Sequence, residues 1–596
     1  MMMKLSHLVP LLAWAFAHAA AQGTPATYDC SPGKACWPTS AQWNALNATL
    51  GGRLHQTVPL AAPCFPSHPA YNVDKCNKVA SNYTYGIGRA SVYGAAESIQ
   101  YEACGSSADC QLLSISPSMP PLFSKCSLGR LAAYYVDAVT AAHVSATLAF
   151  VKQHNIRLSI KNTGHDYLGR SMAPNSLALW THNMKTLAYH KSFTANNCPA
   201  VQLSNVGEMG AGVMAFEAYG FFERYGMNAC GGNAASVGLA GGYGQGGGHG
   251  IFAPMYGLMV DQAVEFDVVT ADGQFRTVNQ CSDPDLFWAM RGGGGGTYAV
   301  LVAYRFRLYP AVPIHMHVLK ANYSILGEKF TQSAIVRSLL TAHVANQSLW
   351  SDNNVTGRYY YGANQATLLT ILPFNDDGSR LKDLTAKWRK GVTAIPNLKV
   401  YEDSYYTYPT YSAYDKVAQE IAARLTPNGF ASNVASRLVP RSLFSSDGGQ
   451  QKSLVDAALE GMERAFSALT IVKPLTSLEV LMTTPANVPD AKGETSANPA
   501  WRDSLWHAIF LGGWMKGYSI DMQQDVIEKV NDAAQPLRHL TPGGGSYANE
   551  DSILVEDWQR TFYGSNYARL LAIKDRYDPT HLFDCYKCVG WRGSQE

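Results

Sequence analysis

The sequence predicts an α+β protein in which an α/β ligand-binding region is interrupted by a second domain. Residues 134–136 are expected to form a short strand and residues 139–153 a helix, because apolar side chains recur on one helical face. Alternation of apolar and polar residues over 156–160 predicts a second strand. That strand runs directly into a polar, glycine-containing loop, residues 162–171. Ligands of such units bind at the carboxyl ends of strands, so this loop is the first candidate site.

The pattern beyond this loop divides the chain further. Residues 264–270 and 275–278 predict a hairpin around an Asp-Gly turn, and a short helix, five glycines (292–296) and a strand follow. Residues from about 311 change in character, and from Tyr547 the chain looks like the first domain again. We therefore expect a signal peptide (1–21), a Cys-rich N-terminal segment (22–125), a binding domain (126–310), a cap domain (311–546) and a C-terminal return to the binding domain (547–596).

Composition excludes several functional classes. Of 596 residues, 47% are apolar and 15% charged, so the chain is neither disordered nor a multi-span membrane protein. Lysine and arginine number 47 and aspartate and glutamate 45, a net charge of +2. This balance gives no global field that would attract nucleic acid or an anionic membrane. We expect a small-molecule substrate and neither nucleic acid nor a membrane as partner; the sequence does not indicate the oligomeric state.

The N-terminal residues have the order of a secretory signal. Lys4 precedes an apolar run, Leu8 to Phe16, and the small residues of Ala17 to Ala21 follow. The run is too short to span a bilayer, and cleavage is expected near Ala21. The alternative is a buried N-terminal helix. We expect the protein to be secreted and extracellular.

Cysteine usage points to the same compartment. The chain holds 12 cysteines, and in an oxidising compartment an even number predicts disulfides, although their connectivity does not follow from spacing. Cys585-x-x-Cys588 could instead be half of a zinc site or a redox pair, but no second such pair completes a zinc site. Glycosylation sequons of a secreted protein occur at Asn47, Asn82, Asn322, Asn346 and Asn354.

Glycine-rich loops that bring backbone N–H groups against phosphate are the main functional signal. Gly242-x-Gly244-x-x-Gly247 matches the dinucleotide fingerprint literally. That fingerprint needs a helix directly after it, and the residues that follow, up to Pro254, cannot form a helix interior. A Rossmann site is therefore disfavoured, while three glycine loops in one α/β region still indicate a phosphate-containing ligand.

Four motifs together resemble one flavoprotein family. Lys161 to Ser171, Val237 to His249, Arg291 to Gly296 and Tyr563 to Leu570 look like the vanillyl-alcohol-oxidase/p-cresol-methylhydroxylase flavoproteins, within them the secreted fungal, berberine-bridge-enzyme-like branch that includes isoamyl-alcohol-oxidase-like enzymes. The resemblance implies a two-subdomain FAD-binding domain of the vanillyl-alcohol-oxidase type and an α/β cap domain with an antiparallel sheet that binds the substrate.

The resemblance also assigns cofactor contacts. His165 matches the histidine that bonds covalently to the 8α-methyl of FAD, and the loop around it would hold the pyrophosphate. Residues 237–242 would line the flavin and its ribityl chain, and Asn566 would sit near the isoalloxazine edge. The full set of expected FAD contacts is Asn162, Thr163, Gly164, His165, Asp166, Ser171, Val237, Gly238, Gly241, Gly242, Gly246, Gly248, His249 and Asn566.

A single covalent link is expected. Many relatives have a second link through a cysteine, but the matching position here is Ala234. Cys230 lies four residues earlier and is expected on the preceding strand, as a buried thiol or in a disulfide.

The implied reaction is hydride transfer from a substrate carbon to flavin N5, with oxygen reduced to hydrogen peroxide. Family inference assigns Val237 to oxygen access. The catalytic base is left open among Tyr547, Glu550 and the tyrosines of residues 401–414, where plain aromatic packing is the competing interpretation. The alternatives are a flavin dehydrogenase or oxidative cyclase of a secondary metabolite, and a non-catalytic secreted glycoprotein.

Other chemistries find less support. Neither G-x-S-x-G nor H-E-x-x-H occurs, which disfavours a hydrolase. His315 and His317 could bind a metal, but alternate residues of a strand share a face in any case, and we expect no metal site.

Overall fold

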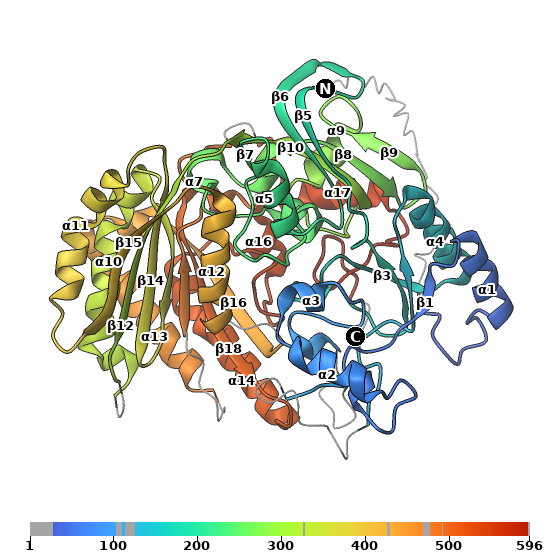
Figure 1. The fold of residues 1–596 in the computed structure, drawn as a ribbon, viewed down its shortest axis with the longest axis horizontal. Helices are drawn as coiled ribbons and strands as arrows, with labels where there is room; N and C mark the ends of the chain where they lie inside the picture. The colour runs from blue at the N-terminus through green and yellow to red at the C-terminus, as the bar shows by residue number, and fades with distance from the viewer. Residues whose placement is uncertain are drawn as a thin grey trace, which may run out of the picture.

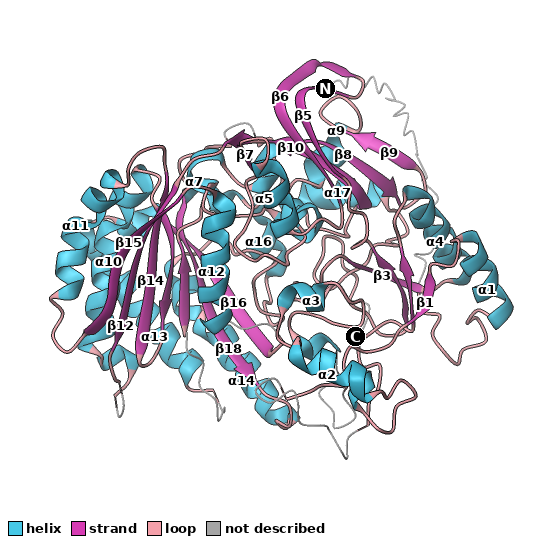
Figure 2. Ribbon diagram, viewed as in Figure 1, coloured by secondary structure: helices cyan, strands magenta, loops and turns pink. Residues whose placement is uncertain are grey.

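A four-, a five- and a seven-stranded β-sheet organise the chain (Figure 1). The computed structural model describes residues 28–102, 110–113, 125–325, 328–425, 429–468, 477–490 and 493–593. The expected signal peptide and Cys104 lie outside these residues. The seven-stranded sheet, with its helices, forms one half of the molecule, and the two smaller sheets form the other (Figure 2).

The four-stranded sheet has the order β1-β2-β4-β3, in which β2, β4 and β3 are parallel. Thr140 caps the crossover helix α4 (Ala141–His154) through its side chain. The predicted strand–helix–strand unit is thus present, and β3 ends where the candidate loop begins. The strands are β1 (Leu54–Gln56), β2 (Tyr134–Asp137), β3 (Arg157–Lys161) and β4 (Ser176–Trp180).

The five-stranded sheet is antiparallel throughout, in the order β5-β6-β10-β8-β9. The predicted Asp-Gly hairpin joins β8 to β9. Arg305 of the central strand pairs with Glu208, Glu265 and Asp267 at 2.8–3.1 Å, which ties three strands together. The strands are β5 (Leu187–Ala195), β6 (Cys198–Gly210), β8 (Ala263–Thr270), β9 (Phe275–Val278) and β10 (Ala299–Arg307).

The seven-stranded sheet is also antiparallel, with order β15-β12-β14-β13-β17-β18-β16. Helices α10 and α11 lie on one side, and α12 lies on the side that faces the smaller sheets (Figure 2). Its strands are β12 (Ile314–Asn322), β13 (Thr356–Tyr361), β14 (Gln365–Pro373), β15 (Lys399–Tyr408), β16 (Ala431–Pro440), β17 (Leu478–Leu481) and β18 (Ser504–Trp514). Its main helices are α10 (Ala334–Asp352), α11 (Ser379–Thr393), α12 (Tyr411–Leu425), α13 (Gln450–Phe466) and α14 (Ile520–Ala533).

His315 and His317 are structural residues of this sheet. Both side chains are buried on β12 and bond to the neighbouring strand, at 2.9 Å from Thr407 and 2.8 Å from Asp403. The two imidazoles thus have protein partners of their own.

After the large sheet, the chain returns to the smaller ones. Lys574 of α17 is fully buried and joins Asp578 at 2.7 Å and the carbonyl of Thr297 at 2.6 Å, which anchors the return beside α9. The remaining helices and short strands are α1 (Ser40–Thr49), α2 (Val73–Ser81), α3 (Gly86–Ala90), α5 (Ala215–Glu223), β7 (Met227–Asn228), α6 (Gly244–Gly246), α7 (Ala253–Tyr256), α8 (Met259–Gln262), α9 (Pro284–Ala289), β11 (Tyr309–Pro310), α15 (Gln535–Leu540), α16 (Trp558–Tyr563) and α17 (Tyr567–Tyr577).

Disulfides tie mainly the two ends of the described chain. The bridges are Cys30–Cys36, Cys64–Cys76, Cys110–Cys126, Cys198–Cys281 and Cys585–Cys588. Among the described cysteines, Cys230 is the one with a free thiol, and it is buried. The sequence predicted Cys230 on the preceding strand. That prediction is wrong: β7 ends at Asn228, and Cys230 lies two residues beyond it.

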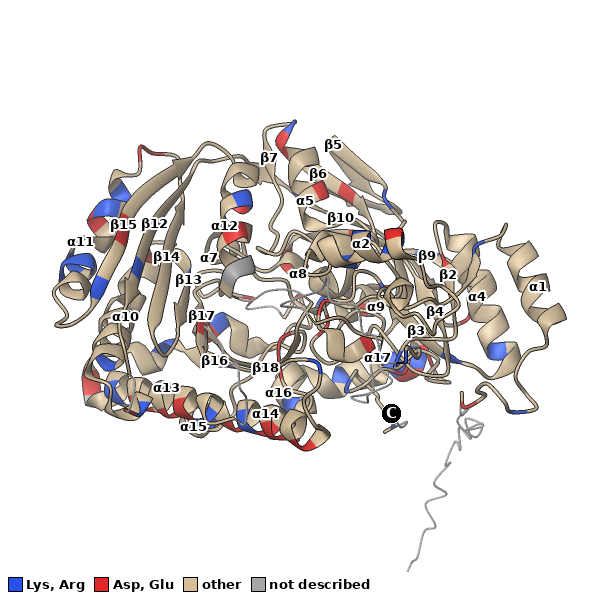
Figure 3. Ribbon diagram, turned by 60° about the horizontal axis from the view of Figure 1, so that its bottom comes forward, with Lys and Arg blue, Asp and Glu red and all other residues tan. Residues whose placement is uncertain are grey.

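Surface charge and helix length are relevant to whether the protein binds nucleic acid or a membrane. Basic and acidic residues are interspersed along α11, α13 and α14 (Figure 3). Within the described residues, no helix combines the length and apolar character needed to cross a membrane.

Candidate active site

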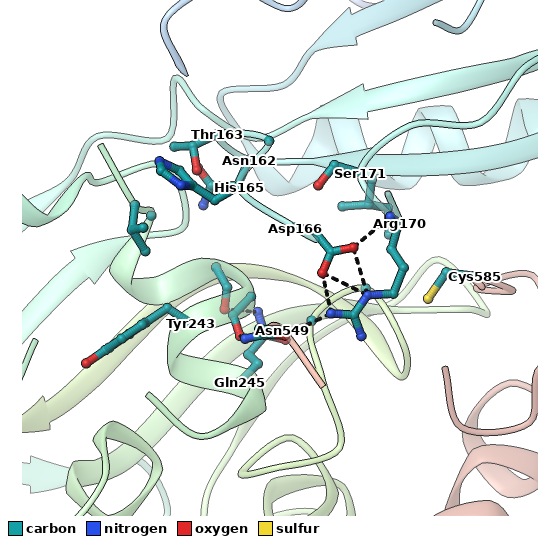
Figure 4. Close-up of a pocket in the computed structure, with 18 of the residues that line it drawn as sticks. Asn162, Thr163, His165, Asp166, Arg170, Ser171, Tyr243, Gln245, Asn549 and Cys585 are labelled. Carbon is teal, nitrogen blue, oxygen red and sulfur yellow. Dashed lines mark hydrogen bonds and ion pairs between the residues drawn. The ribbon is translucent and has the colours of Figure 1, made fainter. Parts of the chain in front are cut away.

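A cavity of about 290 Å³ opens where the loop after β3, the glycine-rich loops, the large sheet and the C-terminal return meet. The side that belongs to the large sheet contributes Arg358 of β13 and Gln419 and Ala422 of α12. Figure 4 shows His165 at one end of the labelled residues, with Asp166 and Arg170 further along the same loop. The cavity therefore lies at the carboxyl end of β3, where an α/β unit binds its ligand.

Asn162 locks the first loop against the second. Its backbone carbonyl accepts a hydrogen bond from Trp180 Nε1 at 3.0 Å, and its amide donates to the carbonyl of Ala211. A Cβ on Gly238 or Gly241 would lie within 2.6 Å of the Asn162 side chain. The two loops approach so closely that only glycine fits at these positions.

Among the residues that the structure describes, the imidazole of His165 is held through its Nε2 atom. Its Nε2 lies 2.8 Å from Ser236 Oγ and 3.6 Å from Glu97 Oε1. Burial lowers the pKa of His165 to about 4, against a smaller opposing effect of Glu550. At neutral pH the ring is thus uncharged, and in the tautomer with the proton on Nε2 the lone pair is on Nδ1.

Asp166 and Arg170 form an ion pair along the cavity wall (Figure 4). Arg170 Nε lies 3.0 Å from both carboxylate oxygens, and its Nη2 donates to Asn549 Oδ1 at 2.8 Å. Burial opposes the charge of Arg170, but the adjacent Asp166 carboxylate outweighs it and raises the pKa. The pair joins the first loop to the C-terminal return.

The glycine loops are tied to one another by Gln245. Its side chain donates to the carbonyls of Ala240 and Gly241 at 3.2 and 3.1 Å. The backbone carbonyl of Gln245 accepts hydrogen bonds from the backbone N–H groups of Gly292 and Gly294 at 3.0 and 3.1 Å. Backbone and not side chains therefore forms much of this wall.

The wall next to the large sheet carries Tyr547 and Glu550. The Tyr547 hydroxyl oxygen accepts hydrogen bonds from Asn549 Nδ2 at 2.8 Å and from Gly248 N at 3.2 Å. Burial and the neighbouring Glu550 raise the pKa of Tyr547. Burial also favours neutral Glu550, but His249, His507 and Arg358 outweigh it and lower the pKa of this carboxyl to about 2. The wall thus presents a phenol beside a stable carboxylate.

Comparisons with known proteins agree with this geometry. The family model described as an FAD binding domain matches residues 132–279, and the model described as berberine and berberine like matches residues 546–588. An FAD-linked oxidoreductase of Aspergillus flavipes is 33% identical over 585 residues, covering 92% of this chain and 92% of that protein. The chain belongs to the berberine-bridge-enzyme-like, VAO-type family of FAD-linked oxidoreductases.

Further matches of this VAO-type flavoprotein cover nearly its whole length. A VAO-type flavoprotein oxidase of Thermothelomyces thermophilus is 33% identical and covers 94% of this chain and 92% of its own. The crystal structure of a VAO-type flavoprotein from Myceliophthora thermophila C1 superposes with a TM-score of 0.80 at 30% identity, covering 94% of this chain and 97% of the other. The predicted fold class is confirmed, and the enzyme is an FAD-dependent oxidoreductase.

The cavity of this VAO-type flavoprotein fits FAD. Bare glycine backbone lines it, and the buried Oδ1 of Asn162 has no partner among the described residues, which leaves an acceptor for a ligand donor. The expected FAD contacts that line the cavity are Asn162, Thr163, Gly164, His165, Asp166, Ser171, Val237, Gly238, Gly241 and Gly242, and the two candidate bases Tyr547 and Glu550 line it as well.

Other expected residues lie elsewhere in this VAO-type flavoprotein. The cavity lining does not include Gly246, Gly248 or His249. Gly246 packs against Asn549, and Gly248 packs against Tyr243. The His249 side chain forms hydrogen bonds with Thr483 and Glu550. Asn566 does not line the cavity, and its amide donates to the carbonyl of Ala497 at 3.0 Å; its position at the flavin edge stays a prediction.

The tyrosines of residues 401–414 do not line the cavity either. Tyr411 is buried against Tyr219 and bonds to the carbonyl of Gly232 at 3.3 Å, which is the packing role that competed with catalysis. Sequence reasoning missed Glu97, Arg170, Arg358, His507 and Asn549. Asn549 lies between two predicted residues, and Arg170 lies inside the predicted loop, so both carried a local signal.

Proposed function

We propose that this oxidoreductase is a secreted oxidase in which His165 carries FAD covalently. The observation that supports this most directly is the placement of the imidazole. Its Nε2 is engaged by Ser236 at 2.8 Å, while its Nδ1 makes no hydrogen bond within the described residues. The neutral ring has the lone pair that a nucleophile needs. When bound, FAD supplies the redox step: it accepts a hydride at N5 and passes two electrons to oxygen, which yields hydrogen peroxide.

A single link is proposed, through histidine only. Ala234 lines the cavity at the position where relatives have a cysteine. Cys230 does not line the cavity, and burial strongly raises the pKa of its thiol, which disfavours the reactive thiolate.

The substrate is proposed to enter between the large sheet and the flavin. Tyr547, Glu550 and Arg358 face this part of the cavity. An alcohol, or a similar substrate with adjacent C–H and O–H groups, would place its oxygen near Tyr547 and Glu550, which we propose as the residues that handle its proton. Val237 also lines the cavity, and we propose that its small side chain leaves oxygen a path to the flavin.

Secretion and glycosylation remain part of the proposal. The five disulfides favour an oxidising compartment. Of the five sequons, Asn82 and Asn322 have exposed side chains, which an oligosaccharyltransferase can reach.

Acid precipitation of the flavin-loaded protein tests the link. The wild-type pellet should stay yellow, whereas His165→Ala should bind FAD weakly in the native state and release it into acid. Release of all flavin from the wild-type protein would show that the link does not exist.

A panel of alcohols, assayed in parallel for peroxide and for reduction of an artificial electron acceptor, tests the acceptor. Peroxide release supports the oxidase. Dye reduction without peroxide would instead support the runner-up, a flavin dehydrogenase or oxidative cyclase; the name of the Aspergillus relative, FAD-linked oxidoreductase, specifies no acceptor. Failure to reduce the bound flavin with any substrate of the panel would favour a non-catalytic secreted glycoprotein.

A further inference from the structure

Three side chains with metal-binding atoms converge beside the cavity. His249 follows the glycine-rich loop, His507 lies on β18, and Glu550 lies in the C-terminal return. Glu550 Oε2 is 3.2 Å from His249 Nε2 and 3.4 Å from His507 Nδ1. One ligand atom from each residue lies within 4.8 Å of the others. Three distant parts of the chain thus present two imidazoles and a carboxylate to one point.

His507 is the member of this cluster that the fold leaves unexplained. Its side chain is fully buried, and neither ring nitrogen makes a hydrogen bond within the described residues. Leaving a buried polar group unsatisfied costs free energy, so a residue of this kind in a native core calls for a partner that the described protein atoms do not provide. The Nδ1 atom points to the carboxylate without reaching hydrogen-bond geometry.

His249 is oriented in the way that metal-binding histidines usually are. Its Nδ1 lies 2.8 Å from Thr483 Oγ1, so Nδ1–H can donate a hydrogen bond to the hydroxyl, which leaves the Nε2 lone pair directed at Glu550. The ring is packed between Trp501 and Tyr547, which fixes its plane. An outer hydrogen bond of this kind sets the tautomer of a ligating histidine.

We propose that His249 Nε2, His507 Nδ1 and Glu550 Oε2 bind a divalent transition-metal ion of the zinc class. Two imidazoles and one carboxylate form a known three-protein-ligand set for Zn²⁺, with a fourth position left open. Tetrahedral bonds of about 2.0–2.1 Å place neighbouring ligand atoms about 3.3–3.4 Å apart, close to the separations of both nitrogens from Glu550. The remaining separation, between the two imidazole nitrogens, is at most 4.8 Å and shortens if the His507 ring turns toward the ion.

The open position of this ion would face the substrate. Glu550 lines the cavity, so a fourth ligand can approach from the cavity side. Provided that the proposed oxidation is correct, the ion would bind the substrate oxygen and favour loss of its proton. Glu550 then binds the ion through Oε2, and its second carboxylate oxygen, Oε1, is left to accept the substrate proton. The substrate class narrows to molecules with a metal-binding oxygen on the carbon that is oxidised.

Metal analysis of the flavin-loaded protein tests the site. The protein is stripped with a chelator, incubated with Zn²⁺ alone, passed into metal-free buffer and analysed for zinc and flavin on the same sample. We expect one zinc per chain and a Co²⁺-loaded form with a visible band beyond the flavin absorption. His507→Leu should lose both signals. The matched control, His343→Leu, removes another fully buried histidine, on α10 of the large-sheet half, and should keep them.

Thr483→Val adds a test that leaves all three ligands in place. Loss of the outer hydrogen bond to His249 should weaken zinc binding by about 10–100-fold. Failure of wild-type protein to retain zinc, or equal retention by His507→Leu, would overturn the proposal and identify the cluster as a purely hydrogen-bonded one. Flavin is measured on the same samples, so the two proposals can fail separately. Zinc retained without acid-stable flavin would reject the covalent link and support the metal site. Acid-stable flavin without retained zinc would reject the metal site alone.

Discussion

His165 Nε2 and Ser236 Oγ lie 2.8 Å apart and join the loop after β3 to the loop that precedes the first glycine-rich turn. The contact fixes the plane of an imidazole whose other nitrogen makes no hydrogen bond to the described part of the chain. It also sets a distance between two loops that are 71 residues apart in the chain. The hydroxyl of Ser236 is therefore a positioning group for the proposed covalent bond.

Ser236→Ala should still bind FAD but should attach it more slowly and less completely, because the imidazole loses the partner that holds its orientation. The fraction of flavin that stays with acid-precipitated protein measures this. Ser236→Thr keeps the hydroxyl and should restore attachment. Complete attachment in the alanine variant at the wild-type rate would show that the contact is incidental.

Proteolytic digestion should give one flavin peptide, which contains His165. Cys230 is buried and its thiol pKa is raised, so no cysteine adduct is expected. Cys230→Ala should leave the acid-stable flavin unchanged. A mass-spectrometric adduct at Cys230 would mean that the glycine loop moves far enough to bring this thiol to the flavin.

Val237→Leu should slow reoxidation of the reduced enzyme severalfold and leave reduction by substrate nearly unchanged. The added methylene would fill space along a cavity wall, and protein interiors have few spare voids. Stopped-flow traces of the two half-reactions separate these effects. Equal reoxidation rates in both proteins would remove Val237 from the oxygen path.

Arg170→Leu should lower the free energy of unfolding by about 3–5 kcal/mol, because it leaves the largely buried Asp166 carboxylate without its partner. The double variant Arg170→Leu, Asp166→Asn removes the charge as well and should recover part of this loss. Thermal unfolding of the three proteins tests this. A double variant that is less stable than Arg170→Leu would contradict the ion-pair explanation.

Acid should destabilise the protein through His343. Burial lowers the pKa of this fully buried imidazole from 6.5 to about 3, so the unfolded chain binds more protons between these values. The contribution of neutral His343 to the free energy of unfolding is fully present above pH 6.5. Between pH 6.5 and about pH 3 it falls by about 1.4 kcal/mol per pH unit.

The measurement is the difference in melting temperature between pH 7 and pH 5. His343→Leu should lower stability at both values, since Tyr361 and Gln347 lose their partner, but should show a smaller difference than wild type. His539→Gln, at an exposed position, should keep the wild-type difference. An unchanged difference in His343→Leu would contradict the assignment.

Local signals predicted the parts of the fold and site that are local in sequence. Alternation predicted β3, helical spacing predicted α4, and an Asp-Gly turn predicted the β8–β9 hairpin. The loop that carries His165 and the glycine-rich loops were predicted from motifs, because backbone approach to a phosphate demands specific residue types.

Contacts between distant segments were not predictable in this way. Glu97 reaches His165 from the N-terminal segment, and Asn549 reaches Arg170 across 379 residues. His507 is one apolar-flanked histidine on a strand, and nothing in its neighbours indicates the cluster that it joins. The same holds for Asn566: the motif gave its position in sequence, but not the hydrogen bond of its amide to the carbonyl of Ala497, 69 residues away in the chain.

The order of translation gives the C-terminal return a further consequence. Tyr547, Asn549, Glu550 and the segment Phe583 to Tyr586 line the cavity, and the ribosome makes them after every other lining residue. A nascent chain that has completed both smaller sheets and the large sheet still has an open wall, with no Asn549 beside Arg170. Stable cofactor capture must therefore follow synthesis of this last wall. The flavin content of the purified protein then reports the fraction of molecules in which this wall is complete.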